Sequence, residues 1–169
     1  RAAVEAAINH NGPVYLRFGR MAVPVIFDNG YKFELGKGVL VAEGKDVTII
    51  ATGIMVDMAL AARELLANEG ISARVVNIHT IKPLDTEIVI KAACETGAIV
   101  TAEEHTVIGG LGAAVCETLC ESCPVPVFRV GVNDTFGRSG KVPALLQIYG
   151  LTPQNIAQKA KSAVAMKRA

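Results

Sequence analysis

The sequence predicts an α/β fold with a mostly parallel, five-stranded sheet and helices on both of its faces. Short apolar runs rich in β-branched residues alternate with helical stretches at a spacing of roughly 25 residues, which is the pattern of βαβ units. Half of the 169 residues are apolar, and the chain contains no Trp. A core of small aliphatic side chains suits strands that are buried between two layers of helices.

Five segments have the composition of strands, and turn residues bound them. The predicted strands are residues 39–41, 47–51, 73–78, 98–102 and 125–130. The second is the clearest, because it is apolar and β-branched and ends before Gly53. The first two strands form a hairpin-like start, which could add one antiparallel edge strand to the parallel sheet.

Five segments of the same region have the pattern of helices. The predicted helices are residues 55–68, 86–95, 108–121, 142–149 and 153–167. In the first of them Met58, Ala62 and Leu65 lie on one apolar stripe, and Gly70 follows as a C-terminal glycine should. The last begins with Thr152 as its N-cap and with proline at the first helical position.

The first 37 residues lack this regularity. Residues 1–8 read as the end of a helix, which residues 10–13 (HNGP) stop, and residues 14–18 read as a short strand. Residues 21–37 contain prolines and glycines without a lasting period, as an extended linker would. We therefore expect this region to be the tail of a preceding domain. The absence of an initiator Met suggests that the chain is part of a longer one.

The charge balance argues against several classes of partner. With 17 basic and 16 acidic residues, the net charge of +1 gives no electrostatic reason to expect binding to nucleic acid or to an anionic membrane. No apolar run is long enough to cross a bilayer, and the N-terminus lacks the apolar core of a signal peptide. We therefore expect a cytoplasmic protein whose four cysteines are reduced.

A glycine-rich stretch at residues 101–112 (TAEEHTVIGGLG) reads as strand, polar turn, glycine hinge and helix. Glycines in this place can let a phosphate approach the helix N-terminus. The dinucleotide fingerprint fails here, because Val115 takes its third small position, and the two preceding glutamates would repel a pyrophosphate. We therefore expect Gly109, Gly110 and Gly112 to permit a tight turn and close packing against the sheet or another subunit.

Glu103, Glu104 and His105 precede these glycines at the end of a predicted strand, where open α/β sheets bind ligands. Their side chains could act as acid, base or metal ligands. No second cluster of ligands accompanies them, so a capping or interface role is the better interpretation, and we predict no metal site. His10 and His79 are expected to be exposed or structural.

Three cysteines, Cys116, Cys120 and Cys123, match the C-x3-C-x2-C spacing of enzymes that hold an iron–sulfur cluster. Those enzymes carry the motif on a loop early in a barrel, and this chain is too short to build one. Here the first two cysteines fall on the apolar side of a predicted helix. We interpret them as small buried hydrophobic residues.

Arg17 and Arg20 are the remaining candidates for a binding site. They flank Gly19 at the end of a short predicted strand, where two guanidinium groups could clamp a phosphate. From spacing alone, a solvated strand end explains them equally well.

Several of these stretches together resemble a known family. The C-terminal domain of transketolase-type thiamine diphosphate enzymes is similar to residues 47–53 (VTIIATG), 76–85 (VNIHTIKPLD) and 101–112. The C-terminal tail of split transketolases, which are made as two polypeptides, is similar to residues 136–140 (FGRSG) and 149–153 (YGLTP). Arg138 stands where that tail usually has a glutamate.

The resemblance implies a three-layer α/β/α domain with one antiparallel edge strand. It further implies that residues 1–23 end a pyrimidine-binding domain, that residues 24–37 are a linker and that residues 38–169 are the transketolase C-terminal domain. Residues 12–20 (GPVYLRFGR) resemble the segment whose arginine grips the sugar phosphate. Arg20 matches that arginine, and Arg17 is a weaker candidate.

For function, the resemblance implies a transferase that moves a two-carbon ketol unit between a ketose phosphate and an aldose phosphate, as in the pentose phosphate pathway. Thiamine diphosphate and a divalent metal such as Mg²⁺ would be bound by other domains, and the activating glutamate would lie upstream. We expect no catalytic residue, cofactor or independent activity in this chain. It would pack against the enzyme's N-terminal section and would contribute to a homodimer.

Three alternatives remain open from the sequence. The chain could be the C-terminal domain of a 1-deoxyxylulose-5-phosphate synthase or of a 2-oxo acid dehydrogenase beta subunit, since both share this domain. It could also be a non-catalytic assembly or regulatory module. The arginine pair favours a phosphosugar over a branched-chain oxo acid, which has no phosphate to hold.

Overall fold

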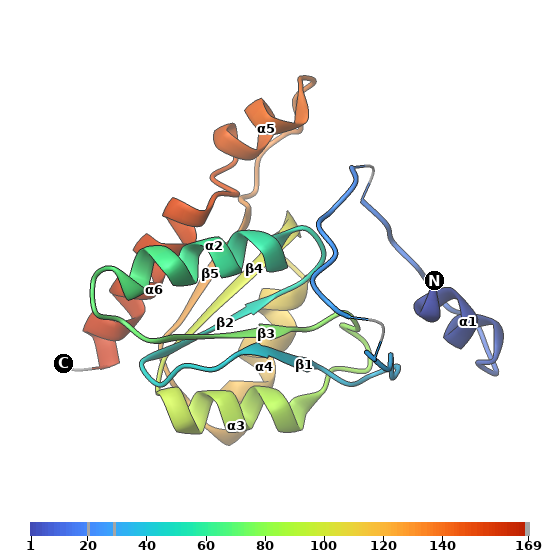
Figure 1. The fold of residues 1–169 in the computed structure, drawn as a ribbon, viewed down its shortest axis with the longest axis horizontal. Helices are drawn as coiled ribbons and strands as arrows, with labels where there is room; N and C mark the ends of the chain where they lie inside the picture. Colours follow the sequence, from blue (N-terminus) through green and yellow to red (C-terminus); the bar gives the residue numbers. More distant parts are fainter. Residues whose placement is uncertain (20, 29, 168–169) are drawn as a thin grey trace.

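The computed structural model describes residues 1–19, 21–28 and 30–167. They form an α/β/α sandwich and an extended N-terminal segment that lies on one side of it (Figure 1). The central sheet has the order β1-β3-β2-β4-β5. Its strands are β1 (Val39–Ala42), β2 (Val47–Ala51), β3 (Ala73–Asn77), β4 (Ile99–Thr106) and β5 (Val127–Val132). The predicted fold class is confirmed, including the single antiparallel edge strand, since only the pairing of β1 with β3 is antiparallel.

The predicted hairpin between the first two strands is wrong. β1 pairs with β3, whereas β2 lies on the other side of β3 and pairs with it in parallel. The four-residue connection between β1 and β2 therefore crosses the start of β3 instead of joining sheet neighbours. Here Lys45 and Asp46 donate backbone hydrogen bonds to the carbonyl oxygen of Ser72, and the Asp46 carboxylate accepts one from the Ser72 N–H at 2.8 Å.

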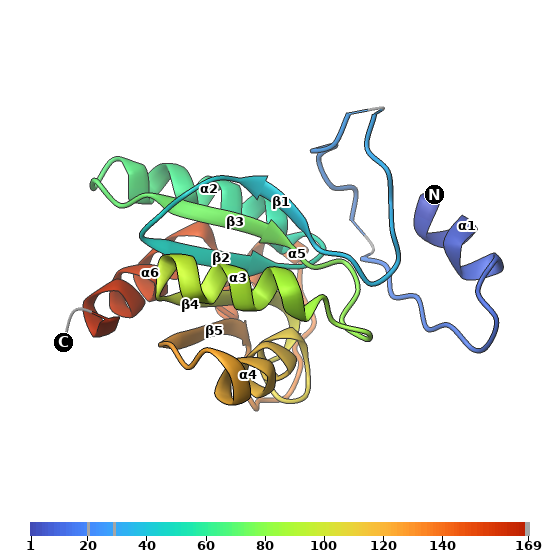
Figure 2. The same cartoon turned by 90° about the horizontal axis from the view of Figure 1, so that it is seen from below.

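The helices are α1 (Ala2–Ile8), α2 (Met55–Ala67), α3 (Thr86–Thr96), α4 (Leu111–Ser122), α5 (Val142–Ile148) and α6 (Pro153–Lys167). Four of them form the two outer layers, whereas α1 and α5 lie outside the sandwich (Figures 1 and 2). α2 and α6 cover one face of the sheet, and α3 and α4 cover the other. Consecutive residues of a strand face opposite sides, so Ile49 belongs to the core under α2 and α6, whereas Ile50 belongs to the core under α3 and α4.

α6 closes the first of these cores. Ile156, Ala160, Ala163 and Val164 recur at helical spacing and are buried against α2 and the sheet. At the end of the helix the Lys167 ammonium donates to the Thr96 carbonyl oxygen at 2.7 Å and also to the carbonyl oxygen of Asp46. The helix thus fastens the end of α3 to the start of β2.

The N-terminal segment lies beyond the edge of the sheet at which the parallel strands end (Figures 1 and 2). α1 confirms the helix predicted at the start of the chain. The strand predicted over residues 14–18 is wrong, because the described residues between α1 and β1 belong to no sheet. Their β-branched and aromatic residues favour an extended backbone, but a strand also needs a neighbour, and no other part of the described chain lies alongside to pair with them.

Among the described residues, no helix has both the length and the apolar character needed to pass through a bilayer.

Candidate functional site

A bulge at the end of β4 sets the directions of the three polar residues that follow Ala102. Between Ala102 and Thr106 the strand advances four residues while its partner β5 advances only two. Such a bulge interrupts the alternation of side chains along a strand. Glu103 therefore points inward and is 1% exposed, whereas Glu104 and His105 are both exposed.

The predicted end of this strand, at Ala102, is wrong. β4 continues to Thr106, so Glu103, Glu104 and His105 lie in the bulged end of the strand and not in the predicted turn. The apolar run ends at Ala102, and the polar residues beyond it gave the appearance of a turn. The turn itself follows at residues 107–110, and Gly109 adopts a φ of 71° there, which glycine alone accepts without strain.

Glu103 caps the N-terminus of α4 from a neighbouring element. Its carboxylate accepts hydrogen bonds from the N–H groups of Leu111, at 2.7 Å, and Gly112, at 2.8 Å. These N–H groups have no partner within the helix, and the helix dipole favours an anion at this end. A Cβ atom on Gly110 would lie 2.0 Å from the Glu103 carboxylate. The glycines therefore admit a carboxylate of the same chain to the place where a phosphate would otherwise bind.

Gly112 allows a second close approach, between α4 and the sheet. A Cβ atom there would lie 2.8 Å from both the Thr101 hydroxyl oxygen and the Cδ of Arg129. The aliphatic part of the Arg129 side chain lies at this contact, and its guanidinium donates a hydrogen bond to the Val107 carbonyl oxygen at 2.9 Å. The turn after β4 is therefore fixed both by the hydrogen bonds between Glu103 and α4 and by the hydrogen bond from Arg129 to Val107.

The N-terminal segment meets the outward residues of β4. We call residues 12–19 the entry segment, because they lead into Arg20. The Arg17 Nη1 atom lies 3.0 Å from the His105 Nδ1 atom, although 88 residues separate them in the chain. One residue before Arg20, a Cβ atom on Gly19 would lie 3.9 Å from the Glu104 carboxylate. Two candidate groups that the sequence left separate are therefore in contact. Arg20 itself lies outside the described residues.

The cluster of Arg17, Glu104 and His105 is suited to holding and orienting a chain segment or an anion. It presents a guanidinium, a carboxylate and an imidazole at the surface, and none of them is buried. Within the described ranges, no three His, Cys, Asp or Glu side chains are grouped so that they could bind a metal ion. The three cysteines near the C-terminal half of α4 do not form such a group. The prediction that they are buried is wrong, because Cys116 and Cys123 are only half-buried and Cys120 is exposed. The partial burial of Cys116 raises the pKa of its thiol.

His79 lies in the loop after β3, at the same edge of the sheet. Its ring packs against that of Phe33, tilted by 35° with centroids 4.4 Å apart, and its Nδ1 atom lies 2.8 Å from the Thr80 hydroxyl. That hydroxyl also accepts a hydrogen bond from the Gly36 N–H. Burial lowers the pKa of His79 below its ordinary value of 6.5, because charging the ring here would cost its hydration.

The depressed pKa of His79 predicts acid-sensitive stability. The unfolded chain takes up a proton on His79 as the pH falls through 6.5, whereas the folded chain resists it, so stability is present above this pH and is lost below it. We expect the urea midpoint of the wild type to fall between about pH 7.5 and about pH 5.5, and His79→Gln to reduce that fall. The matched control is His10→Gln, at an exposed position, which should keep the full wild-type fall. Equal slopes for all three proteins would contradict the assignment.

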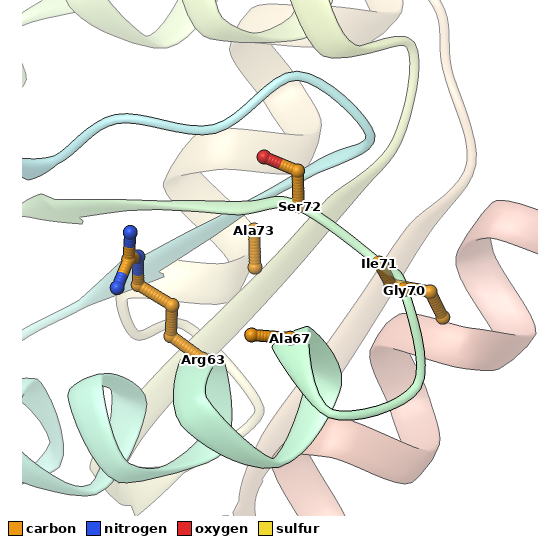
Figure 3. Close-up of a pocket in the computed structure, with 6 residues that line it drawn as sticks. All are labelled: Arg63, Ala67, Gly70, Ile71, Ser72 and Ala73. Carbon is orange, nitrogen blue, oxygen red and sulfur yellow. The ribbon is translucent and has the colours of Figure 1, made fainter.

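Two hollows in the surface lie away from this cluster. One, of about 210 Å³, opens where α2 ends and β3 begins, at the edge of the sheet opposite to the end of β4 (Figure 3). Its lining comprises Arg63, Ala67, Gly70, Ile71, Ser72 and Ala73. The other, of about 440 Å³, lies between the loop that carries Phe136 and Arg138 and the end of α5 near Tyr149. Arg17, the described member of the predicted phosphate-binding pair, lines neither hollow.

Comparison with known proteins identifies the family. The model of the family "Transketolase, C-terminal domain" matches residues 36–156. The chain is 50% identical over 167 residues to the 6-deoxy-6-sulfo-D-fructose transketolase subunit SqwH of Clostridium sp. (strain MSTE9), covering 99% of this chain and 52% of that protein. It is 43% identical over 161 residues to a 1-deoxy-D-xylulose-5-phosphate synthase of Heliobacterium modesticaldum, covering 94% of this chain and 25% of that protein.

A solved structure described as a split gene transketolase, an inactive beta4 tetramer, superposes with a TM-score of 0.95 at 51% identity. The overlay covers 99% of this chain and 55% of that one, so it includes the entry segment. The chain thus spans about half the length of the transketolase subunits it matches. On the evidence of the family model, these relatives and the shared fold, the chain belongs to the transketolase C-terminal domain family.

Proposed function

We propose that this chain is the C-terminal part of a transketolase, which in the complete enzyme transfers a two-carbon ketol unit between a ketose phosphate and an aldose phosphate. One observation carries the proposal. The similarity to transketolase subunits extends over 99% of the chain at 50–51% sequence identity, and it includes the entry segment as well as the sandwich. In this proposal, residues 1–23 end the pyrimidine-binding domain, residues 24–37 are the linker and residues 38–169 are the C-terminal domain.

The proposed cofactors, thiamine diphosphate and a divalent metal such as Mg²⁺, belong to other parts of the enzyme. The residues of this chain do not fit them. The N-terminus of α4, which would suit a diphosphate, is filled by the Glu103 carboxylate. No cluster of metal ligands exists in the described ranges. We propose that this chain leaves the cofactors to the other parts of the enzyme and shows no ketol transfer by itself; the occupied N-terminus of α4 is the observation that favours this.

The proposed partners are the N-terminal section of the same enzyme and a second copy of this chain, in a cytoplasmic assembly. The similar solved structure is described as a beta4 tetramer, which is a property of that protein. It motivates a measurement of the mass of this protein by light scattering. The turn at Gly109, Gly110 and Gly112 and the residues Glu104 and His105 are proposed to contribute to the contact with these partners. The sugars are proposed to be phosphorylated, as in the pentose phosphate pathway.

Arg20 is proposed to bind the phosphate of the sugar, with a weaker contribution from Arg17. We expect Arg20→Ala in the complete enzyme to raise the KM for a phosphorylated aldose by about 30-fold, which corresponds to the loss of one hydrogen bond between charged groups. The KM for the unphosphorylated aldose should change by less than about twofold, because the removed group would bind only the phosphate. The thermal unfolding midpoint should change by less than about 1 °C.

A matched control is Arg1→Ala, which removes an arginine side chain that is 98% exposed and forms an ion pair with Glu5, at 4.0 Å. It should leave both KM values unchanged. If Arg20→Ala shows the kinetics of the wild type, Arg20 has no role in phosphate binding and the proposed function loses its substrate site.

A second candidate function is that of 1-deoxyxylulose-5-phosphate synthase, which the relative from Heliobacterium modesticaldum supports at 43% identity. A panel of donors and acceptors on the complete enzyme separates the two. Turnover with a ketose phosphate donor and an aldose phosphate acceptor supports the transketolase, and turnover only with a 2-oxo acid donor supports the synthase.

A further inference from the structure

We propose that Cys94 and Cys123 form a redox-sensitive pair, which on oxidation links the end of α3 to the end of α4 by a disulfide. The inference goes beyond the proposed function and does not depend on it, because both residues belong to the sandwich itself. The structure holds the two residues as free thiols, which is the reduced state of the pair. A disulfide of low molecular weight, such as oxidised glutathione, is the oxidant.

The order of the elements brings the two cysteines to the same edge of the sheet. α3 leads from β3 to β4, and α4 leads from β4 to β5, so both helices end where the parallel strands β4 and β5 begin. The two helices pack against each other on one face of the sheet (Figure 2). Cys94 lies in the last turn of α3, and Cys123 is the C-cap of α4. This edge is opposite to the one beyond which the N-terminal segment lies (Figure 1).

Cys94 lies on the flank of α3 that is turned toward α4. The next residue, Glu95, points to the other flank, because its carboxylate forms an ion pair with Arg74 of β3. In the sheet, β3 lies on the far side of β2 from β4 and β5, which α4 covers. Successive residues of a helix are turned by roughly 100°, and Ala93 and Thr96 face the sheet, so the Cys94 thiol is directed outward and toward α4.

Cys123 completes the contact from α4. It is half-buried and packs against the core under α3 and α4, whereas Cys94 is exposed. A hydrogen bond with the Cys94 thiol raises the pKa of the Cys123 thiol. Cys120 lies one turn earlier in α4, and its charge acts on Cys116. The sulfur group that acts on Cys123 is therefore the one on α3 and not one of its own helix.

The oxidation is a thiol–disulfide exchange in two steps. The thiolate of the exposed Cys94 attacks one sulfur of oxidised glutathione and releases one glutathione thiolate. The thiolate of Cys123 then attacks the Cys94 sulfur of this mixed disulfide and releases the second. Two electrons pass from the protein sulfurs to the oxidant, and the two thiol protons end on two molecules of glutathione.

The disulfide closes a loop that contains the candidate site. Residues 95–122 comprise β4 with Glu103, Glu104 and His105, the glycine turn and the whole of α4. A cross-link between the two ends of such a unit restricts its opening. Oxidation therefore makes the support of the candidate site more resistant to local unfolding without altering any of its residues.

Peptide mapping of the complete enzyme identifies the link. Cleavage after glutamate places each of the four cysteines on a different peptide, because Glu95, Glu117 and Glu121 separate them. After incubation with oxidised glutathione, we expect the peptide that ends at Glu95 to be joined to the one that begins after Glu121. Addition of a reductant should separate the two peptides.

Single variants show which thiols take part. Cys94→Ser and Cys123→Ala should each abolish the joined peptides, whereas the matched controls Cys116→Ser and Cys120→Ser should keep them. Circular dichroism of the reduced variants checks their folding, and Cys94→Ser, at an exposed position, tests the pair even if Cys123→Ala is destabilised. A link from either residue to any other cysteine, glutathione retained on Cys94, or four unreacted thiols in the wild type would overturn the proposal.

Hydrogen exchange of the reduced and oxidised enzyme tests the consequence. We expect the backbone amides of residues 99–122 to exchange more slowly after oxidation by about tenfold or more, because they exchange through openings that the cross-link restricts. α5 lies outside the closed loop and should exchange equally in both states, and Cys94→Ser should show no difference in either region. Equal exchange of residues 99–122 in the two states of the wild type would overturn the stabilising role of the disulfide.

Discussion

Replacement of Glu103 by glutamine is expected to lower the free energy of unfolding by about 2–3 kcal/mol. The carboxylate is 1% exposed and accepts two hydrogen bonds from the start of α4. Glutamine keeps the size of the side chain but replaces one acceptor oxygen with an NH₂ group. A donor then faces a donor, and one N–H of the helix is left buried without a partner. The favourable interaction of a negative charge with the helix dipole is lost as well.

The adjacent glutamate is the matched control for this change. Glu104→Gln makes the same chemical substitution at an exposed position one residue later, and surface substitutions of this kind usually change stability by less than about 0.5 kcal/mol. Urea unfolding of the two variants, followed by circular dichroism, compares them directly. Equal stabilities for Glu103→Gln and Glu104→Gln would show that the buried carboxylate does not stabilise α4.

Gly44→Ala is expected to destabilise the fold by about 3 kcal/mol or more, or to prevent accumulation of soluble protein. Gly44 lies in the connection that crosses the start of β3. A Cβ atom on it would lie 2.2 Å from the backbone carbon of Ala73 and from the backbone nitrogen of Arg74. These atoms belong to a strand with partners on both sides, so they cannot move away as the tip of a flexible side chain can.

The control for this prediction is Gly137→Ala. No atom lies within 4 Å of a Cβ placed there, so this variant should unfold at nearly the same urea concentration as the wild type. The comparison separates the loss of space at Gly44 from the general effect of replacing glycine by alanine, which by itself stabilises slightly through the unfolded chain. If Gly44→Ala is as stable as Gly137→Ala, the crossing of β3 is looser than the structure shows.

The strands and helices of the sandwich could be predicted because local signals define them. Residues 47–51 are apolar and β-branched between turn residues, and β2 has these same bounds. α3 begins at a capping aspartate, Asp85, and ends before Gly97, which adopts the left-handed conformation. The pairing of β1 was mispredicted because it depends on a strand more than 30 residues away, and no local signal distinguishes that partner from the adjacent β2.

The candidate site was only partly predictable. The residue types and the glycine spacing singled out Glu103, His105 and Gly110 from the sequence. Their roles could not be assigned, because a bulge, which depends on the neighbouring strand, decides which side chain is buried. The contact between Arg17 and His105 joins residues 88 positions apart, one of them in a segment without periodicity. No pattern in a single sequence links two such positions.

The place of α6 in the sandwich has a consequence for synthesis. This helix covers the sheet beside α2, yet it is made after every strand. When a ribosome has released residues 1–152, all five strands are available, but the part of one sheet face that α6 covers, mainly along β4 and β5, is bare to water. That part gains its cover only when residues 153–167 emerge. A nascent chain arrested before that point should therefore bind chaperones and be cut by proteases, whereas one arrested with the whole helix outside the exit tunnel should resist both.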